Sequence, residues 1–276
     1  HWIGAGFITR KEREVIPKII HYCWFGRSPL SELTKQCIAS WEKYCPEYKI
    51  IRWDENNVDL NSCSFVRQAY KEKKWAFVSD YVRLKVVNEY GGIYLDTDVE
   101  LIKPLDDLLI YPAYIGFEIN KEWYVNSGLG FGSVNNNPVL ESLIMEYENI
   151  NFVNEDGTLN ITPCPIRETK ALTKIGLIPD GQCQSFDNIV IFSADYFCPV
   201  SITGERNFSD KTYSIHHYDA SWFSEQKRKG LQRKKRFIKL FGNLIGTYIN
   251  KPFIFVDECR EFGLVKAIKN MRSNFP

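Results

Sequence analysis

The fold of this chain is most constrained by a long apolar helix pattern that stops at a glycine pair and passes directly into a short strand. Residues 76–90 place apolar side chains at helical intervals, and the glycines at 91–92 predict the end of that helix. The strand expected at Ile93–Leu95 then leads into Asp96 and Asp98. A helix followed at once by a strand is typical of an α/β sheet.

The two aspartates predict a metal site. Side chains at positions i and i+2 of a strand project to the same side, so we expect Asp96 and Asp98 to converge on one hard divalent cation. Two carboxylates suit Mn²⁺ or Mg²⁺, which can neutralise the charge on a leaving nucleoside diphosphate. Asp98 is the expected direct ligand, whereas Asp96 is expected to bind a ribose or a metal-bound water. The alternative is an acidic pair on a solvated loop.

Four more side chains are candidates for substrate contacts. Asp80 and Arg83 lie three residues apart on one helix face, where together they can hold sugar hydroxyls; the alternative is a solvated ion pair. Trp24 ends the first expected strand and is a candidate to stack on a base, although a core position is equally typical. Asn126 opens a glycine-rich stretch that suits close approach of a ligand, with a glycine bulge as the alternative.

The rest of the pattern alternates strands with helices, which predicts an α/β sheet with helices on both faces. Ligands in such folds bind beyond the carboxyl ends of the strands. Residues 151–181 contain many helix and strand breakers, and we assign no chemistry there. The expected strands are 18–24, 48–53, 93–95, 114–118 and 129–131, and the expected helices are 34–44, 64–73, 76–90 and 138–150.

Three segments resemble glycosyltransferase family 32, which includes polysaccharide transferases, mannosyltransferases and large toxin glucosyltransferases. They are the stretch that ends in the acidic pair, a Pro-Lys-Ile-Ile-His opening, and a distal His-His-Tyr-Asp-Ala-Ser-Trp element, at residues 76–98, 16–26 and 215–222. The resemblance implies a single GT-A nucleotide-binding domain with a mostly parallel mixed sheet at 16–222. It also implies retention of anomeric configuration.

The resemblance extends the candidate site. Ser79, Tyr94 and Tyr22 fall in the matching segments and are expected to contact the nucleotide-sugar, although Tyr22 is equally typical of a core. From the distal element, His217 is expected to be the third metal ligand or a phosphate contact, in preference to its neighbour His216. A histidine ligand favours Mn²⁺ over Mg²⁺. The hydroxyl of Ser221 and the indole N–H of Trp222 are expected to donate to phosphate oxygens.

Composition bears on location. The 35 basic and 34 acidic residues give a net charge of +1, so the overall charge gives no information on polyanion binding, and only local clusters of charge can. The eight cysteines show no zinc-ligand spacing. No secretory signal or membrane-spanning run is evident, so we expect reduced thiols and a cytoplasmic location, with a Golgi-lumen relative as the alternative.

The C-terminal part, residues 223–276, is expected to be a basic, amphipathic helical appendage. Residues 227–239 hold eight basic side chains and no acidic one, and an apolar stretch follows. Such a helix is typical of a membrane surface, which predicts peripheral binding at the inner face of the membrane near a lipid-linked acceptor. A solvated face is the alternative, and nucleic-acid binding ranks last because no RNA-module pattern is present.

Three classes of function follow. The first is a metal-dependent retaining transferase that moves a hexose from a nucleotide-sugar, with a UDP-sugar favoured, to a glycan acceptor in capsular or other surface polysaccharide synthesis. The second applies the same chemistry to a protein acceptor, as an effector. The third is a non-catalytic membrane or interaction module in which the acidic pair is only surface charge.

Overall fold

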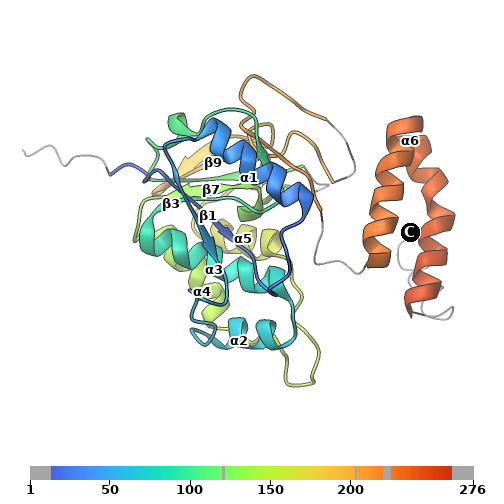
Figure 1. The fold of residues 1–276 in the computed structure, drawn as a ribbon, viewed down its shortest axis with the longest axis horizontal. Coiled ribbons are helices and arrows are strands. Elements are labelled where there is room, and N and C mark those ends of the chain that lie inside the picture. The colour runs from blue at the N-terminus through green and yellow to red at the C-terminus, as the bar shows by residue number, and fades with distance from the viewer. Residues whose placement is uncertain (1–13, 120–121, 203, 205, 220–224, 263–276) are drawn as a thin grey trace, which may run out of the picture.

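A computed structural model describes residues 14–119, 122–202, 204, 206–219 and 225–262 (Figure 1). The helices are α1 (Glu32–Tyr44), α2 (Ser64–Lys71), α3 (Trp75–Tyr90), α4 (Pro138–Glu148), α5 (Cys164–Thr173) and α6 (Glu225–Phe262), with short 3-10 turns η1 (Asp106–Leu108) and η2 (Ser127–Leu129). The strands are β1 (Ile19–Cys23), β2 (Lys49–Trp53), β3 (Gly92–Tyr94), β4 (Val99–Leu101), β5 (Ala113–Glu118), β6 (Tyr124–Val125), β7 (Phe131–Ser133), β8 (Gln184–Phe186), β9 (Ile189–Phe192) and β10 (Ser214–His216).

The main sheet is mixed. Its strand order is β2-β1-β3-β7-β5-β9-β8, with β6 paired to β5, and β10 pairs separately with β4. The pairs β1–β2, β1–β3 and β5–β9 are parallel, while β7 runs antiparallel to both β3 and β5. Strands β2, β1, β3, β5 and β9 therefore point the same way. Their carboxyl ends lie along one edge of the sheet, where α/β folds bind ligands.

Helices cover both faces of this sheet (Figure 1). On one face, the fully buried Trp41 of α1 packs edge-on against Tyr22 of β1, with ring centroids 5.7 Å apart. On the other face, α3 packs against β1, β3, β7, α2 and α4. This arrangement confirms the α/β class with a mixed sheet flanked by helices.

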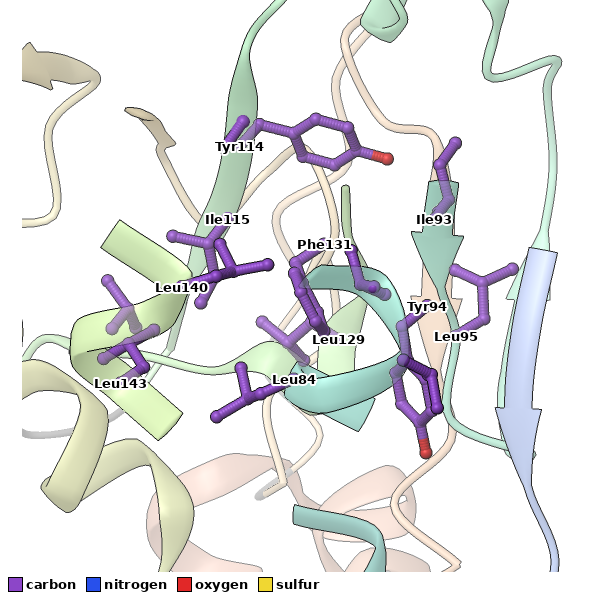
Figure 2. Close-up of a cluster of buried hydrophobic side chains, with 14 of the residues drawn as sticks. Leu84, Ile93, Tyr94, Leu95, Tyr114, Ile115, Leu129, Phe131, Leu140 and Leu143 are labelled. Carbon is purple, nitrogen blue, oxygen red and sulfur yellow. The ribbon is translucent and has the colours of Figure 1, made fainter. Parts of the chain in front are cut away.

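The core lies between α3, α4 and the sheet. Figure 2 shows Leu84 of α3 and Leu140 and Leu143 of α4 directed toward Ile115 and Phe131 of the sheet. All five side chains are at most 2% exposed. Nine of the 16 residues of α3 are buried, and Asp80 and Arg83 are among them, so these two charged groups face protein and not solvent.

Most predicted elements are present, with three differences. The predicted strand 129–131 is wrong: η2 occupies Ser127–Leu129, and β7 begins at Phe131. The acidic pair does not continue β3, which ends at Tyr94; it lies in a turn closed by the bond from the Val99 N–H to the Asp96 carbonyl, 3.0 Å. The stretch 151–181 contains α5, because Pro163 and Pro165 occupy the start of a helix, where proline is tolerated.

The segment α6 consists of two helices joined at Gly242, whose φ of 78° breaks the helical path. A Cβ at Gly246 would lie 2.6 Å from the Phe237 backbone, so the two helices pack closely. Arg233 forms an ion pair with Asp257 across them. Within the described residues, no helix has the length and apolar character needed to cross a bilayer.

His21 forms hydrogen bonds that hold the backbone just before β3 in place. Its Nε2 lies 2.8 Å from the Gly91 carbonyl, and its Nδ1 lies 3.0 Å from the indole Nε1 of Trp53. The indole can only donate, so Nδ1 accepts and Nε2 carries the proton. Burial lowers the pKa of this neutral imidazole. The histidine of the opening motif is therefore structural, and it ties β1 to β2 and to the glycine turn before β3.

We predict that His21→Phe leaves the Gly91 carbonyl and the Trp53 N–H unpaired and lowers the free energy of unfolding by about 2 kcal/mol at about pH 8. Because the folded state lowers the pKa of His21, its contribution is complete above about pH 6.5 and is lost as the pH falls. The difference between the two proteins therefore shrinks toward about pH 5.5, as measured by urea unfolding. A difference that grows on acidification would contradict this assignment.

Candidate active site

Asp96, Asp98 and His216 form one cluster at the carboxyl edge of the sheet. Each offers a ligand atom, and these atoms lie within 4.8 Å of one another. The turn after β3 positions the aspartates, and antiparallel pairing of β10 with β4 brings His216 opposite Val99. The carboxylates of Asp96 and Asp98 are 26% and 16% exposed, so both are accessible from outside.

The groups around Asp98 stabilise its ionised carboxylate. Burial alone would raise its pKa, but His216, with Nε2 3.2 Å away, and the Asp219 N–H, 2.8 Å away, outweigh burial and lower the pKa to about 2. Burial would likewise lower the pKa of His216, but the adjacent carboxylate of Asp98 raises it. A metal ion and a proton would therefore compete for the imidazole of His216.

Asp80 and Arg83 form a buried ion pair, which contradicts the alternative of a solvated pair. The Arg83 guanidinium is 4% exposed, and its NH2 lies 2.7 Å from Asp80 Oδ1 and 3.5 Å from Asp96 Oδ1. Burial raises the pKa of Asp80 to about 6, against the opposing effect of Arg83. The sequence-predicted helix pair and the acidic motif therefore lie in one charged cluster, as expected for parts of one site.

One predicted residue, Tyr94, supports Asp96 directly, and another, Asn126, orders the glycine-rich stretch beside it. The Tyr94 hydroxyl donates to Asp96 Oδ1 at 2.8 Å. Asn126 accepts from the Gly128 N–H at 2.7 Å and donates to Glu118 at 2.9 Å. A Cβ at Gly128 would lie 2.5 Å from Asp96 Oδ2, so glycine is needed there for close approach. The glycine-rich stretch is therefore a wall of the site.

Glu168 is an important residue that sequence reasoning missed. It is 1% exposed on α5, and its carboxylate accepts hydrogen bonds from the backbone N–H and the hydroxyl of Ser127. Ser127 in turn accepts from Arg83 NH1 at 3.2 Å. Burial raises the pKa of Glu168 to about 7. The residue lies 41 positions from Ser127, and no local pattern marks it.

His216, and not His217, completes the metal cluster. His217 Nε2 lies 2.8 Å from Glu100 Oε2, and its side chain is 34% exposed. Neighbouring residues on an extended strand point in opposite directions, so only one of the two imidazoles can face Asp98. The expectation that His217 is the third ligand is corrected on this ground.

The remaining candidates lie outside the cluster or outside the described residues. Tyr22 is 8% exposed and packs in the core against Trp41, which leaves little surface for a base. Trp24 is partly buried and donates from Nε1 to the Ser28 carbonyl at 2.7 Å. Ser79 bonds within its own helix, to the Trp75 carbonyl. The predicted phosphate donors lie outside the described residues; they are Ser221 and Trp222.

The donor set fits a divalent cation. Two carboxylates and an imidazole suit Mn²⁺, and a diphosphate and water can supply further oxygen ligands. The buried Nδ1 of His216 has no hydrogen-bond partner among the described residues, while its Nε2 is directed at Asp98. The ring is therefore oriented with Nε2 toward the position that a cation would occupy.

Parts of this chain are similar to known proteins. Residues 31–114 match the family described as "Glycosyltransferase sugar-binding region containing DXD motif". Inositol phosphoceramide mannosyltransferase 3 of Schizosaccharomyces pombe is 30% identical over 116 residues, which cover 39% of this chain and 31% of that protein. Mannosyl phosphorylinositol ceramide synthase SUR1 of Saccharomyces cerevisiae is 28% identical over 110 residues, 37% of this chain and 28% of that protein.

A solved structure, PaToxG glycosyltransferase, is 22% identical, with a TM-score of 0.46 over 58% of this chain and 70% of that one. The chain thus spans about a third or less of the length of the curated relatives it matches. The matched region contains Asp80, Arg83 and both aspartates of the cluster. Within residues 31–114, the DXD motif of the matching family corresponds to Asp96 to Asp98.

We predict that His216→Ala weakens Mn²⁺ binding by about 100-fold, because an imidazole ligand is lost. In the wild type, affinity should fall as the pH drops through the raised pKa of His216, since metal and proton compete for the ring. Isothermal titration at several pH values measures both effects. His217→Ala is the matched control, and an equal loss in both variants would contradict the assignment.

Proposed function

We propose that this chain is a metal-dependent, retaining GT-A glycosyltransferase that moves a hexose from a nucleotide-sugar to a glycan acceptor. The observation that carries the proposal is the group formed by Asp96, Asp98 and His216 directly beside the buried Arg83 and Asp80. Such a group can hold the diphosphate of a donor on one side and its sugar on the other.

In the proposed reaction, the acceptor hydroxyl oxygen attacks the anomeric carbon, and the bond from that carbon to the diphosphate oxygen breaks. A cation held by Asp96, Asp98 and His216 supplies charge neutralisation for the departing diphosphate. Asp98 remains ionised throughout the neutral range because its pKa is held at about 2. Tyr94 fixes the orientation of Asp96 through its hydroxyl.

We propose that Asp80 and Arg83 shape the pocket for the donor sugar. With 9% and 4% of their side chains exposed, they offer a sugar only a small polar edge. Their larger effect is on Asp96, whose carboxylate Arg83 approaches to 3.5 Å. Positioning of this kind contributes to catalysis by holding the reacting groups in place.

The contacts and burial of Asp80 and Glu168 support retention of anomeric configuration without a carboxylate nucleophile. Asp80 is engaged by Arg83 at 2.7 Å. Glu168 is enclosed behind Ser127 and is 1% exposed. We therefore propose a front-face reaction in which the acceptor proton passes to the departing phosphate oxygen, so that no protein carboxylate has to attack.

We predict that wild-type protein hydrolyses or transfers sugar from one member of a panel of UDP- and GDP-sugars, and only with Mn²⁺ or Mg²⁺. Asp98→Ala should lose at least about 100-fold in kcat/KM, because one carboxylate ligand is removed. Released nucleoside diphosphate measures turnover. The exposed Asp156→Ala is the control. Turnover that needs neither metal nor Asp98 would overturn the proposal.

We propose further that α6 binds the inner face of a membrane and brings the site to a lipid-linked acceptor in the cytoplasm. Four large apolar side chains around Gly242 are 49–73% exposed: Leu240, Phe241, Ile245 and Tyr248. The preceding residues 227–239 carry eight basic side chains and no acidic one. Apolar area beside positive charge suits anionic lipid. The names of the two yeast relatives, which concern inositol phosphoceramide, support a lipid-borne acceptor.

We predict that the protein sediments with phosphatidylserine-containing vesicles and much less with pure phosphatidylcholine. Phe241→Asp should weaken this binding about ten-fold or more, because it places a charge in the apolar surface. Ile110→Asp, at a position that is 62% exposed in the catalytic part, is the matched control. Equal sedimentation of both variants would contradict a role for α6.

A further inference from the structure

A second pocket opens on the same edge of the sheet as the acidic cluster. It has a volume of about 350 Å³ and is lined by Trp123, Gln182, Asp195, Arg206 and Asn207, among others. The residues come from three loops that follow β5, precede β8 and follow β9. No part of the proposed donor site uses these side chains.

The topology places this pocket beside the donor site. Strands β3, β5 and β9 are parallel in direction, and only β7 separates β3 from β5. Neighbouring strands lie about 4.8 Å apart, so the ends of β5 and β9 lie roughly 10–15 Å across the edge from the end of β3. Glu118, the last residue of β5, holds Asn126 in the wall of the donor site, and the next residue, Ile119, lines the pocket.

Trp123 provides a rigid aromatic surface in this pocket. A Cβ at Gly181 would lie 2.6 Å from the indole ring, so the ring packs directly on a glycine that has φ of 78°. The ring edge also contacts Phe117, with centroids 6.3 Å apart. Trp123 remains 36% exposed. A side chain larger than hydrogen at position 181 would displace the indole. The glycine at this position therefore allows the observed placement of Trp123.

The polar lining suits a neutral, hydroxyl-rich ligand. Asp195 is held in place because its two carboxylate oxygens accept from the hydroxyls of Ser193, 2.6 Å, and Ser209, 2.7 Å. Gln182 and Asn207 add exposed amides, which both donate and accept. The lining combines one carboxylate, one guanidinium and two amides around an aromatic face. This combination does not favour a strongly charged ligand of either sign. It does match the apolar ring face and hydroxyl edge of a sugar.

We propose that this pocket, the Trp123 pocket, binds a saccharide unit of the acceptor, with a sugar ring against Trp123 and hydroxyls on Gln182 and Asn207. The designation as acceptor rests on the proposed glycosyltransferase function, whereas saccharide binding itself does not. Because the loops after β5 and β9 emerge at the same edge as the turn after β3, a short oligosaccharide in this pocket can reach the transferred sugar.

The test is saturation-transfer NMR with a panel of p-nitrophenyl hexosides and their disaccharides, without donor or metal. Wild-type protein should transfer saturation to at least one of them, and Trp123→Ala should abolish the signal. Gln182→Ala, at an exposed position, should weaken it without a change in fold. Phe208→Ala removes a neighbouring aromatic side chain that is 48% exposed and does not line the pocket, so it should retain the signal.

In turnover assays, Trp123→Ala should raise the acceptor KM by about ten-fold, as expected when one aromatic stacking contact is lost. Asp98→Ala should still bind the hexoside, which separates the two proposals. Hexoside binding without turnover from any donor would reject the proposed function and leave the pocket assignment standing. Absence of binding in wild type, or equal binding in Trp123→Ala and Phe208→Ala, would overturn the Trp123 pocket.

Discussion

The buried guanidinium of Arg83 is the interaction on which the rest of the site depends. A charge that is 4% exposed is stable only when paired, and Arg83 contacts Asp80, Asp96 and the hydroxyl of Ser127. These partners come from α3, from the turn after β3 and from η2. The Arg83 side chain therefore connects α3, the turn after β3 and η2. Loss of this cation would leave several carboxylates close together without compensation.

The acids around this cation differ in their ionisation. Burial raises the pKa of Asp80 to about 6 and that of Glu168 to about 7, even with Arg83 nearby. Asp98, which has its own partner in His216, has a pKa of about 2. One carboxylate in the cluster is thus firmly anionic, as a metal ligand should be, while the acids deeper in the protein are closer to neutrality. The division follows from the balance between burial and attractive partners: burial prevails at Asp80 and Glu168, and the partners prevail at Asp98.

The sequence predicts those parts of the fold and site that depend on local pattern. The helix before Gly91, the first two strands and the acidic pair follow from spacing and turn chemistry. Long-range contacts were not predictable: Glu168 meets Ser127 across 41 residues, and only the direction of β10 decides that His216 faces Asp98. Helix α5 was missed because its two prolines were interpreted as breakers, although they stand where a helix can begin.

The polarity of the sheet connects donor chemistry with acceptor recognition. Because β3, β5 and β9 share one direction, their terminal loops must emerge on one edge, whatever those loops contain. Because β7 runs antiparallel between β3 and β5, the glycine-rich loop that precedes it also lies at this edge, between the ends of β3 and β5. The acidic cluster and the Trp123 pocket are consequently neighbours that do not overlap. Glu118 joins them physically, since it binds Asn126 in one site and precedes the loop that lines the other. A change in acceptor preference can therefore arise in the loops after β5 and β9 while the residues that hold the metal and diphosphate stay the same.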